Sequence, residues 1–472
     1  MSNRKRIKLG LTYSSLRDVS KSVNQKVNVI GVVLETSFAK ETTGTDECCI
    51  LRIIDDTHHD VSMSVNVFSE NIQRLPLVAA LGDVIQLIDF VVNLHNGEVN
   101  IVYKKSSSSF ALYKGKDGDD LDPYQVSSRF YLRRKDKMLI DRMRKWLINF
   151  KLVEDSSKFP MFREFKEDTY INLACKIIYH NETANDELFI FAWDGSDLQP
   201  NVIRSNLEDE LKHSLPLQLE HLPLPRGILC TFPTMGSIIR ITFEQGIHKS
   251  HLHLLCVGQW VKFTNLRLKV DDGLWHGIFT LTTKVRYVQN EDQLILERQR
   301  LSDERLSLIS QRMHDLSFPQ PLSITVNYYN RMTPVTLMSV LTHSEVTAIF
   351  KCVVRVVAAT PYQAELLCSP TTGRYNMRLT LEDSTARIHA YVSDEDGETL
   401  FDGYPGPEKV RMKLKKLLGT SDSDGSNDGV KGALRNPPWV CICLKSYYLS
   451  KDDIWGSRNF RVFGTKIMED SS

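Results

Sequence analysis

The features that this sequence lacks exclude several classes of protein. No apolar run approaches the ~20 residues of a membrane span, and the basic start at residues 2–8 has no apolar segment like that of a signal peptide. This start is a nuclear import signal, an arm that contacts phosphates, or simply a solvated terminus. Nine cysteines, an odd number without regular spacing, indicate a reducing compartment. The net charge of +1 argues against a histone-like protein that binds by charge alone.

Catalytic motifs are also missing. The chain has no Walker phosphate loop, no G-x-S-x-G elbow, no H-E-x-x-H motif and no G-x-G-x-x-G turn. The aspartates that end strands, such as Asp55, Asp194 and Asp383, are scattered along the chain. We interpret them as turn formers rather than as the centre of a metal-dependent nuclease. We therefore predict a protein that is not an enzyme and has no cofactor.

Four cysteines near the C-terminus have to be weighed as a zinc site. Alternation places Cys441 and Cys443 on one face of a strand, and Cys352 and Cys368 supply two further thiols. The spacing of the first pair is unlike that of the usual zinc knuckle. We expect buried, reduced thiols here and no metal.

Three segments of the chain share one order of strands. Each has a long apolar strand, a loop, a second strand that ends in an acidic turn, a return strand and a later strand led by Gly or Pro. The first strands are expected at 27–33, 171–178 and 346–357. This order suits the OB-fold, a five-stranded Greek-key barrel. We predict a mostly β chain of three tandem OB-folds with short linking helices.

The domains are expected at 1–150, 151–319 and 320–472. Apolar stripes predict helices at 135–150 and 302–316, near the two joints. A stretch rich in Ser, Asp and Gly around 418–432 is typical of a flexible insertion. The first domain has 22 Lys and Arg against 18 Asp and Glu, whereas the second has 19 against 23. A polyanion is therefore expected mainly on the first domain.

One aromatic residue carries the main functional signal. In the strand at 61–68, valine and methionine alternate with Ser62, Ser64, Asn66 and Phe68. A period of two gives a strand one buried and one exposed face, so Phe68 is expected on the exposed face. There it is either a packing contact beneath a loop or a platform on which an unpaired base stacks.

Further basic, polar and aromatic residues of the first domain are expected on the same side. They are Lys40, Thr45, Asn66, His95, Lys104, Ser108 and Phe110. Interleaved basic and aromatic side chains suit a groove that follows phosphates while bases stack on rings. The polar residues are suited to reading the edges of unpaired bases. Core packing is the alternative for Phe110, and a solvated strand end is the alternative for Lys104.

Several short motifs are more specific than the barrel pattern. They include Gly44-Thr45-Asp46, Val65-Asn66-Val67-Phe68, Trp193-Asp194-Gly195 and Leu400-Phe401-Asp402-Gly403-Tyr404. With these motifs, nearly the whole chain resembles the protection of telomeres protein 1 family, and its plant branch in particular. The resemblance implies that the first two OB-folds bind the G-rich telomeric single strand and that the third engages partner proteins. It also implies that Phe68 stacks on a base, and that Thr45, Asp46 and Ser108 are loop contacts.

The sequence departs from the family pattern at three positions. Glu35 stands where vertebrate relatives have a second stacking aromatic, Asp89 where they have a basic residue, and His95 where they have tyrosine. Carboxylates close to a phosphate track would lower the affinity for nucleic acid.

We therefore expect a nuclear protein of the telomeric chromosome end that binds single-stranded telomeric DNA, caps the end and regulates telomere length. Telomerase ribonucleoprotein and capping proteins are the expected partners, and no membrane is involved. The alternative is a telomerase-associated adaptor whose barrels bind protein or RNA with little direct DNA binding.

Overall fold

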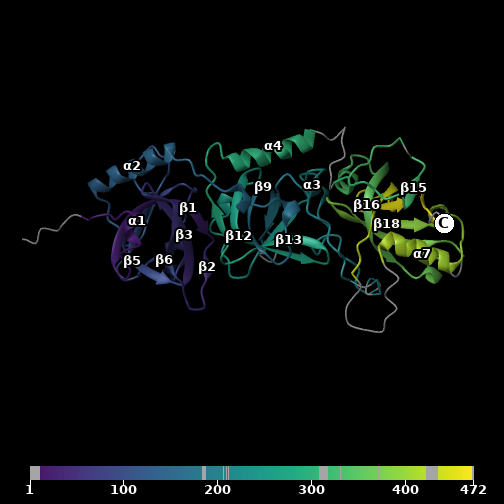
Figure 1. Cartoon of the computed structure of the whole chain (residues 1–472), viewed down its shortest axis with the longest axis horizontal. Coiled ribbons are helices and arrows are strands. Elements are labelled where there is room, and N and C mark those ends of the chain that lie inside the picture. The colour runs from purple at the N-terminus through teal and green to yellow at the C-terminus, as the bar shows by residue number, and fades with distance from the viewer. Residues whose placement is uncertain are drawn as a thin grey trace, which may run out of the picture.

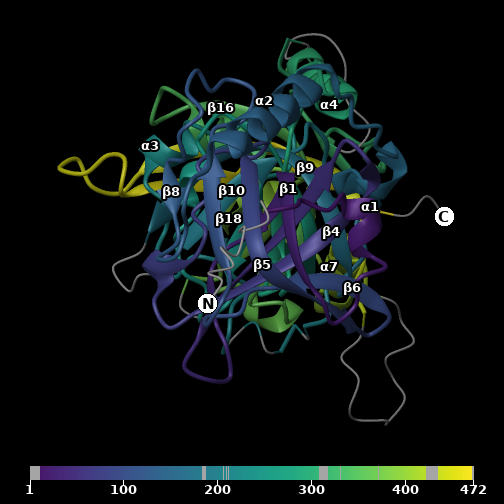
Figure 2. The same cartoon turned by 90° about the vertical axis from the view of Figure 1, so that its left-hand side faces the viewer.

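The computed structural model describes residues 11–182, 188–205, 207–208, 210, 212–307, 317–329, 331–369, 372–420 and 434–469. Three β bodies follow one another along the long axis of the molecule, in chain order (Figure 1). Seen along that axis, they lie one behind another with the first toward the viewer (Figure 2). In the described part of the chain, no helix is both long and apolar enough to cross a membrane.

The first body is a closed five-stranded barrel. Its ring runs β1 (Lys26–Ser37), β3 (Glu47–Asp55), β4 (His58–Ser69), β6 (Glu98–Val102), β5 (Val84–His95) and back to β1. The strands β2 (Lys40–Glu41), β7 (Ser109–Tyr113) and β8 (Gln125–Val126) extend it. As alternation predicts, Met63, Val65 and Val67 point into the barrel core.

The other two bodies close in the same order. The second ring runs β9 (Tyr170–Glu182), β10 (Leu188–Trp193), β11 (Ile239–Phe243), β13 (Leu274–Phe279), β12 (Trp260–Asp271) and back to β9. The third runs β16 (Ile349–Thr360), β17 (Asn376–Glu382), β18 (Arg387–Ser393), β20 (Arg458–Val462) and β19 (Trp439–Tyr448). A separate pair is formed by β15 (Thr325–Asn327) and β21 (Thr465–Ile467). The prediction of OB-folds is confirmed.

One aspartate performs the same task in each barrel. Oδ2 of Asp55, Asp194 and Asp383 accepts the backbone N–H of Leu16, Phe162 and Leu337, at 2.7, 2.8 and 2.7 Å. The second oxygen of each accepts the hydroxyl of the Ser or Thr two residues later. The aspartate thus ties the turn after the second strand to the segment that precedes the first. These residues are structural turn formers, as the sequence indicates.

The helices are few and mostly short. They are α1 (Leu16–Val19), α2 (Arg134–Asn149), α3 (Arg226–Leu229), α4 (Gln293–Ser307), α5 (Leu337–Thr342), α6 (Asp394–Phe401) and α7 (Pro407–Leu418). The prediction of a helix at 135–150 is confirmed by α2. The prediction at 302–316 begins too late, because the inward face of α4 carries Arg298 and Arg305 and so hides its apolar period. Residues 308–316, like 421–432 of the expected insertion, lie outside the described residues.

The first two barrels share strand pairing. Strand β14 (Lys284–Arg286) pairs with β12 of the second barrel and with β1 of the first, so that Glu35 faces Arg286 and Ser37 faces Lys284. One sheet path therefore crosses from barrel to barrel. The exact domain limits of 150 and 319 stay predictions.

Candidate nucleic-acid interface

The outer face of the β3–β4 hairpin carries the predicted aromatic. Cross-strand pairs on this face are Cys48 with Phe68, Ile50 with Asn66, and Arg52 with Ser64. Phe68 and Asn66 are half-buried, whereas the alternating valines are in the core. Part of the Phe68 ring is therefore accessible, which the base-stacking interpretation requires.

Lys40 lies in the same row as Phe68. Register places Lys40 opposite Cys48, which in turn lies opposite Phe68, and Lys40 also forms a bridge with Ile247 of the second barrel. The Lys40 ammonium donates to the carbonyl of Leu281 at 3.1 Å. This lysine is therefore partly engaged in holding the two barrels together.

Two loops meet at the Phe68 end of the hairpin. Lys105 Nζ donates to Asp46 Oδ1 at 2.6 Å and to Glu70 Oε1 at 2.9 Å, so the loop after β6 lies against the loop before β3. Thr45 and Lys104 are exposed beside this ion pair. The structure thus brings Thr45, Asp46 and Lys104 together, although Asp46 is occupied by Lys105.

Two predicted contact residues are not available at the surface, and these predictions are corrected. Phe110 is 1% exposed and lies in the core of the first barrel, because its strand places it inward. Ser108 is also 1% exposed; its hydroxyl donates to the carbonyl of Asp89 at 2.8 Å and accepts the amide of Lys104 at 2.9 Å. Ser108 shapes the loop that presents Lys104.

His95 lies apart from the Phe68 end. It is exposed at the tip of the β5–β6 hairpin, opposite Glu98. A single-stranded nucleic acid that contacts both Phe68 and His95 has to run along the outer face of β4.

Three cations of this surface were missed from the sequence. Arg52 pairs with Ser64, and Lys284 and Arg286 project from β14 at the joint. Burial lowers the pKa of Lys284; Glu35 opposes this shift, while Arg52 and Lys40 lower the pKa further. An anion at this place would relieve the repulsion among these cations. The alternation of charged and apolar residues in Lys284-Val285-Arg286 is the sequence signal that could have identified two of these three cations.

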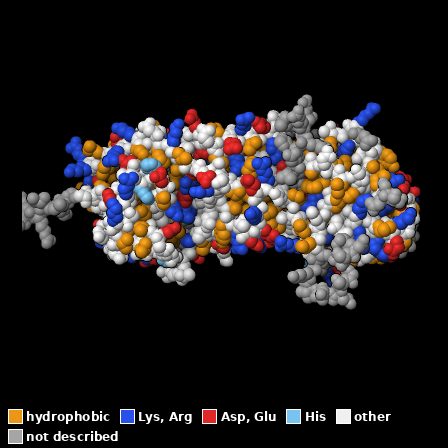
Figure 3. Space-filling model, viewed as in Figure 1, with side chains coloured by type: hydrophobic (Ala, Val, Ile, Leu, Met, Phe, Trp, Pro, Cys, Tyr) orange, Lys and Arg blue, Asp and Glu red, His pale blue; other side chains and the backbone are white. Residues whose placement is uncertain are grey.

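A polar groove opens between the first two barrels. It measures about 1080 Å³, and its lining includes the rings of Trp146 and Phe150. The charged side chains of the lining are the cations Arg52, Lys151, Lys158, Lys284 and Arg286 and the acids Glu35, Asp60, Glu154 and Asp155. Trp146 and Phe150 pack against each other with ring centres 4.6 Å apart, and His59 lies against both. Blue Lys and Arg side chains gather where the first barrel meets the second, beside pale blue histidines (Figure 3). Cations beside rings suit a single-stranded polyanion.

The two acidic residues that depart from the family pattern have structural roles, Glu35 through its carboxylate and Asp89 through its backbone. Glu35 is only 4% exposed and forms an ion pair with Arg286, with Arg52 Nε at 4.0 Å from its other oxygen. Its charge is therefore balanced inside the joint. Asp89 is half-buried at a positive φ of 55°, and its amide donates to Asn28 Oδ1 at 3.0 Å. Asp89 thus serves a bend in β5.

The four cysteines considered as zinc ligands do not converge. All four are within the described part of the chain, and no three of them come together as a ligand set there. Burial raises the pKa of Cys443 to about 11, and Cys441 receives a hydrogen bond from Asn327 Nδ2 at 3.3 Å. They are free thiols, and most are buried, as expected.

A row of OB-fold barrels with an aromatic ring and cations on the outer face of the second and third strands defines a tandem OB-fold protein of the single-strand-binding class. Residues 8–157 match the family model "Telomeric single stranded DNA binding POT1/CDC13". Residues 320–453 match the model "POT1A-like, OB fold domain".

Similar proteins cover almost the whole chain. Protection of telomeres protein 1b of Arabidopsis thaliana is 34% identical over 96% of this chain and 97% of its own, and protein 1a is 35% identical over the same shares. The chain belongs to the protection of telomeres protein 1 family. The crystal structure of fission yeast Pot1 and ssDNA, 16% identical, covers 62% of this chain and 95% of its own, but its TM-score of 0.27 is too low to support a comparison of the two structures.

Proposed function

We propose that this protein binds the G-rich single strand at telomeres and thereby caps the chromosome end. The observation that carries the proposal is the accessible Phe68 ring on a face that continues, through Arg52 and Lys284, into the groove at the joint. Bases would stack on Phe68 while Asn66 and Ser64 bond base edges and the cations meet phosphates. No covalent chemistry is needed, so we propose a binding protein rather than an enzyme, located in the nucleus at telomeres.

The proposal is tested by titrating the whole protein into a labelled G-rich telomeric oligonucleotide at two salt concentrations. Loss of one stacked base costs ~1–3 kcal/mol, so Phe68→Ala should weaken binding about 5- to 150-fold. The matched control is Tyr404→Ala, which truncates a 53% exposed aromatic of the third barrel and should leave the affinity unchanged. Equal affinity of wild type and Phe68→Ala would refute the role of Phe68.

A second function is favoured by one feature of the same site. The exposed Lys105 forms ion pairs with Asp46 and Glu70, and these two carboxylates offset its charge. This reduces the positive charge next to Phe68 and is what an adaptor with little direct DNA binding would show. In that role the protein would act through the telomerase ribonucleoprotein and capping proteins. Absence of oligonucleotide binding by the intact protein, together with recovery of telomerase on pull-down, would favour the adaptor.

A further inference from the structure

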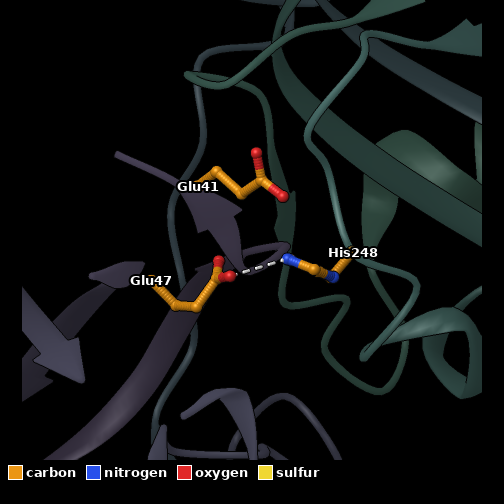
Figure 4. Close-up of side chains that lie close together, drawn as sticks. All are labelled: Glu41, Glu47 and His248. Carbon is orange, nitrogen blue, oxygen red and sulfur yellow. Dashed lines mark ion pairs between the residues drawn. The ribbon is translucent and has the colours of Figure 1, made fainter. Parts of the chain in front are cut away.

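Two glutamates and a histidine converge where the first barrel touches the second. Glu41 belongs to β2, Glu47 begins β3, and His248 lies on the loop that follows β11. One ligand atom of each lies within 4.8 Å of the others, and the side chains point toward one another (Figure 4). In the described ranges, no other three His, Cys, Asp or Glu side chains meet in this way.

Among the described residues, the one ion-pair partner of these two carboxylates is His248, whose Nε2 lies 3.0 Å from Glu47 Oε1 and which is charged only when protonated. Glu41 and Glu47 are direct partners across the β2–β3 pair, and like charges in such positions destabilise the pairing. Within the part of the chain that the structure describes, no Lys or Arg forms a salt bridge with either. The neighbouring Lys40 directs its ammonium to the Leu281 carbonyl instead. A bound cation would remove this repulsion.

Two donor atoms of the cluster are shielded from solvent without a hydrogen-bond partner. They are Glu47 Oε2 and His248 Nε2. His248 Nε2 lies 3.0 Å from Glu47 Oε1, but the geometry is not that of a hydrogen bond. Buried polar atoms without partners are costly, so these two point to a ligand. Carboxylate oxygens with an imidazole nitrogen are a donor set that Zn²⁺ accepts.

The backbone already holds the three segments in place. The amide of Glu41 donates to the Gly246 carbonyl at 3.1 Å, and the amide of His248 donates to the Ala39 carbonyl at 2.8 Å. Zn–O and Zn–N bonds of ~2.1 Å place tetrahedral ligand atoms about 3.4 Å apart. Glu47 and His248 are near that separation, so only the exposed Glu41 side chain has to move.

We propose that Glu41, Glu47 and His248 form a Zn²⁺ site that fastens the first loop of the first barrel to the second barrel. Three protein ligands leave one tetrahedral position for water, so the site is weaker than one closed by four side chains. Zinc would also steady the loop at 42–46, next to the Phe68 end of the candidate interface. The proposal does not depend on DNA binding.

The test is calorimetric titration of ZnCl₂ into the chelator-treated full chain, with X-ray absorption at the zinc edge. We expect one saturable site with oxygen and nitrogen ligands only, and a rise in melting temperature on binding. Glu41→Gln, Glu47→Gln and His248→Asn should each weaken binding at least tenfold, whereas the control Glu98→Gln on exposed β6 should not. Glu41→Gln changes an exposed side chain and leaves the backbone bonds intact, so it tests the site even if another variant unfolds.

Three outcomes would overturn the proposal. One is the absence of saturable zinc binding by the wild type. Another is sulfur coordination, which would assign the metal to thiols such as the exposed Cys230 and Cys256. The third is unchanged affinity in the double variant Glu41→Gln/His248→Asn.

Discussion

The joint between the first and second barrels is built differently from the joint between the second and third. At the first joint, β1 and β14 pair as strands, and a chain of ion pairs links Glu35, Arg286, Glu154 and Lys262 beside the open polar groove. The charges there are balanced by side chains from both barrels. Phe38 of the first barrel also packs against Phe243 and Phe279 of the second, so the joint combines a buried aromatic contact with an open polar groove.

Between the described residues of the second and third barrels, the strand pairing is one isolated bridge, from Ile203 to Arg435, in place of a strand ladder. Arginines of the third barrel reach backbone carbonyls of the second: Arg355 donates to Asn201, Arg387 to Pro216 and Asp272, and Arg435 to Ser205. Of these three, Arg387 also lines a cavity of about 420 Å³ whose wall is mainly apolar, with Phe191, Phe232 and Met338 among its side chains.

The difference shows how one fold supports two uses. All three barrels have the same strand order and the same aspartate turn, yet the surfaces between them decide what they can bind. A shared sheet with a polar groove suits a polyanion that passes from barrel to barrel. A buried arginine joint suits a fixed arrangement of the third barrel.

The largest effect is expected from removing one arginine of the second joint. Arg387 is fully buried and donates to Glu382 Oε2 at 3.0 and 2.5 Å. Arg387→Ala would leave Glu382 with Arg355 alone and remove the bonds to Pro216 and Asp272, and should destabilise the third barrel and its contact with the second by ~3–5 kcal/mol. Urea unfolding followed by tryptophan fluorescence measures the shift of the corresponding transition.

The control is Arg374→Ala, which breaks an exposed ion pair with Asp394. It should lower the free energy of unfolding by no more than ~1 kcal/mol. Equal effects would contradict the buried joint.

As the pH is lowered, the first joint should open at a higher pH than the second. His251 Nε2 accepts the Val78 amide at 3.3 Å across the first joint, and burial, with His253, lowers the His251 pKa from 6.5 to about 3. Because the folded-state pKa of His251 lies below the unfolded value, neutral His251 contributes its full stabilisation of the folded state above pH 6.5. This stabilisation falls by ~1.4 kcal/mol per pH unit as the pH drops toward 3.

At the second joint two groups act in opposite directions. Burial lowers the pKa of His389 to about 4, which also favours opening in acid, but it raises the pKa of Asp383 to about 6. Ionised Asp383 destabilises the folded state above pH 6. As the pH falls from 6 to 3.8, the carboxyl becomes protonated in the folded protein and this destabilisation is lost. Hydrogen exchange of the Val78 amide should therefore accelerate at a higher pH than that of the Ile203 amide, which bonds Arg435. His251→Gln should remove the difference.

The smallest effect concerns the charge of the groove. Lys284→Gln should lower the slope of the logarithm of the DNA-binding constant against the logarithm of salt by ~0.7, because one phosphate contact to a single strand is lost. Lys451→Gln, on the exposed surface of the third barrel, should leave the slope unchanged. An equal slope for both variants and the wild type would place the DNA path away from this joint.

Local patterning was sufficient to predict the first strand of each barrel, the strand that ends in an acidic turn, and the helix α2. The period of two in β4 places Phe68 outward, the repeated acidic turns mark the second strands, and the apolar stripe predicts α2. The same reasoning failed for Phe110, because all five residues of β7 are buried and the strand has no exposed face for alternation to reveal. It also placed the start of α4 too late, because two buried arginines interrupt the stripe.

The sequence alone determined the barrels, their order and the aromatic on the outer face, since these depend on neighbours along the chain. Only the tertiary structure decided that Glu35 is neutralised by Arg286, that Lys284 adds to the interface, and that Glu41, Glu47 and His248 meet. Those contacts join residues more than two hundred positions apart in the sequence. Their partners are set by how the barrels dock, and no local period encodes that geometry.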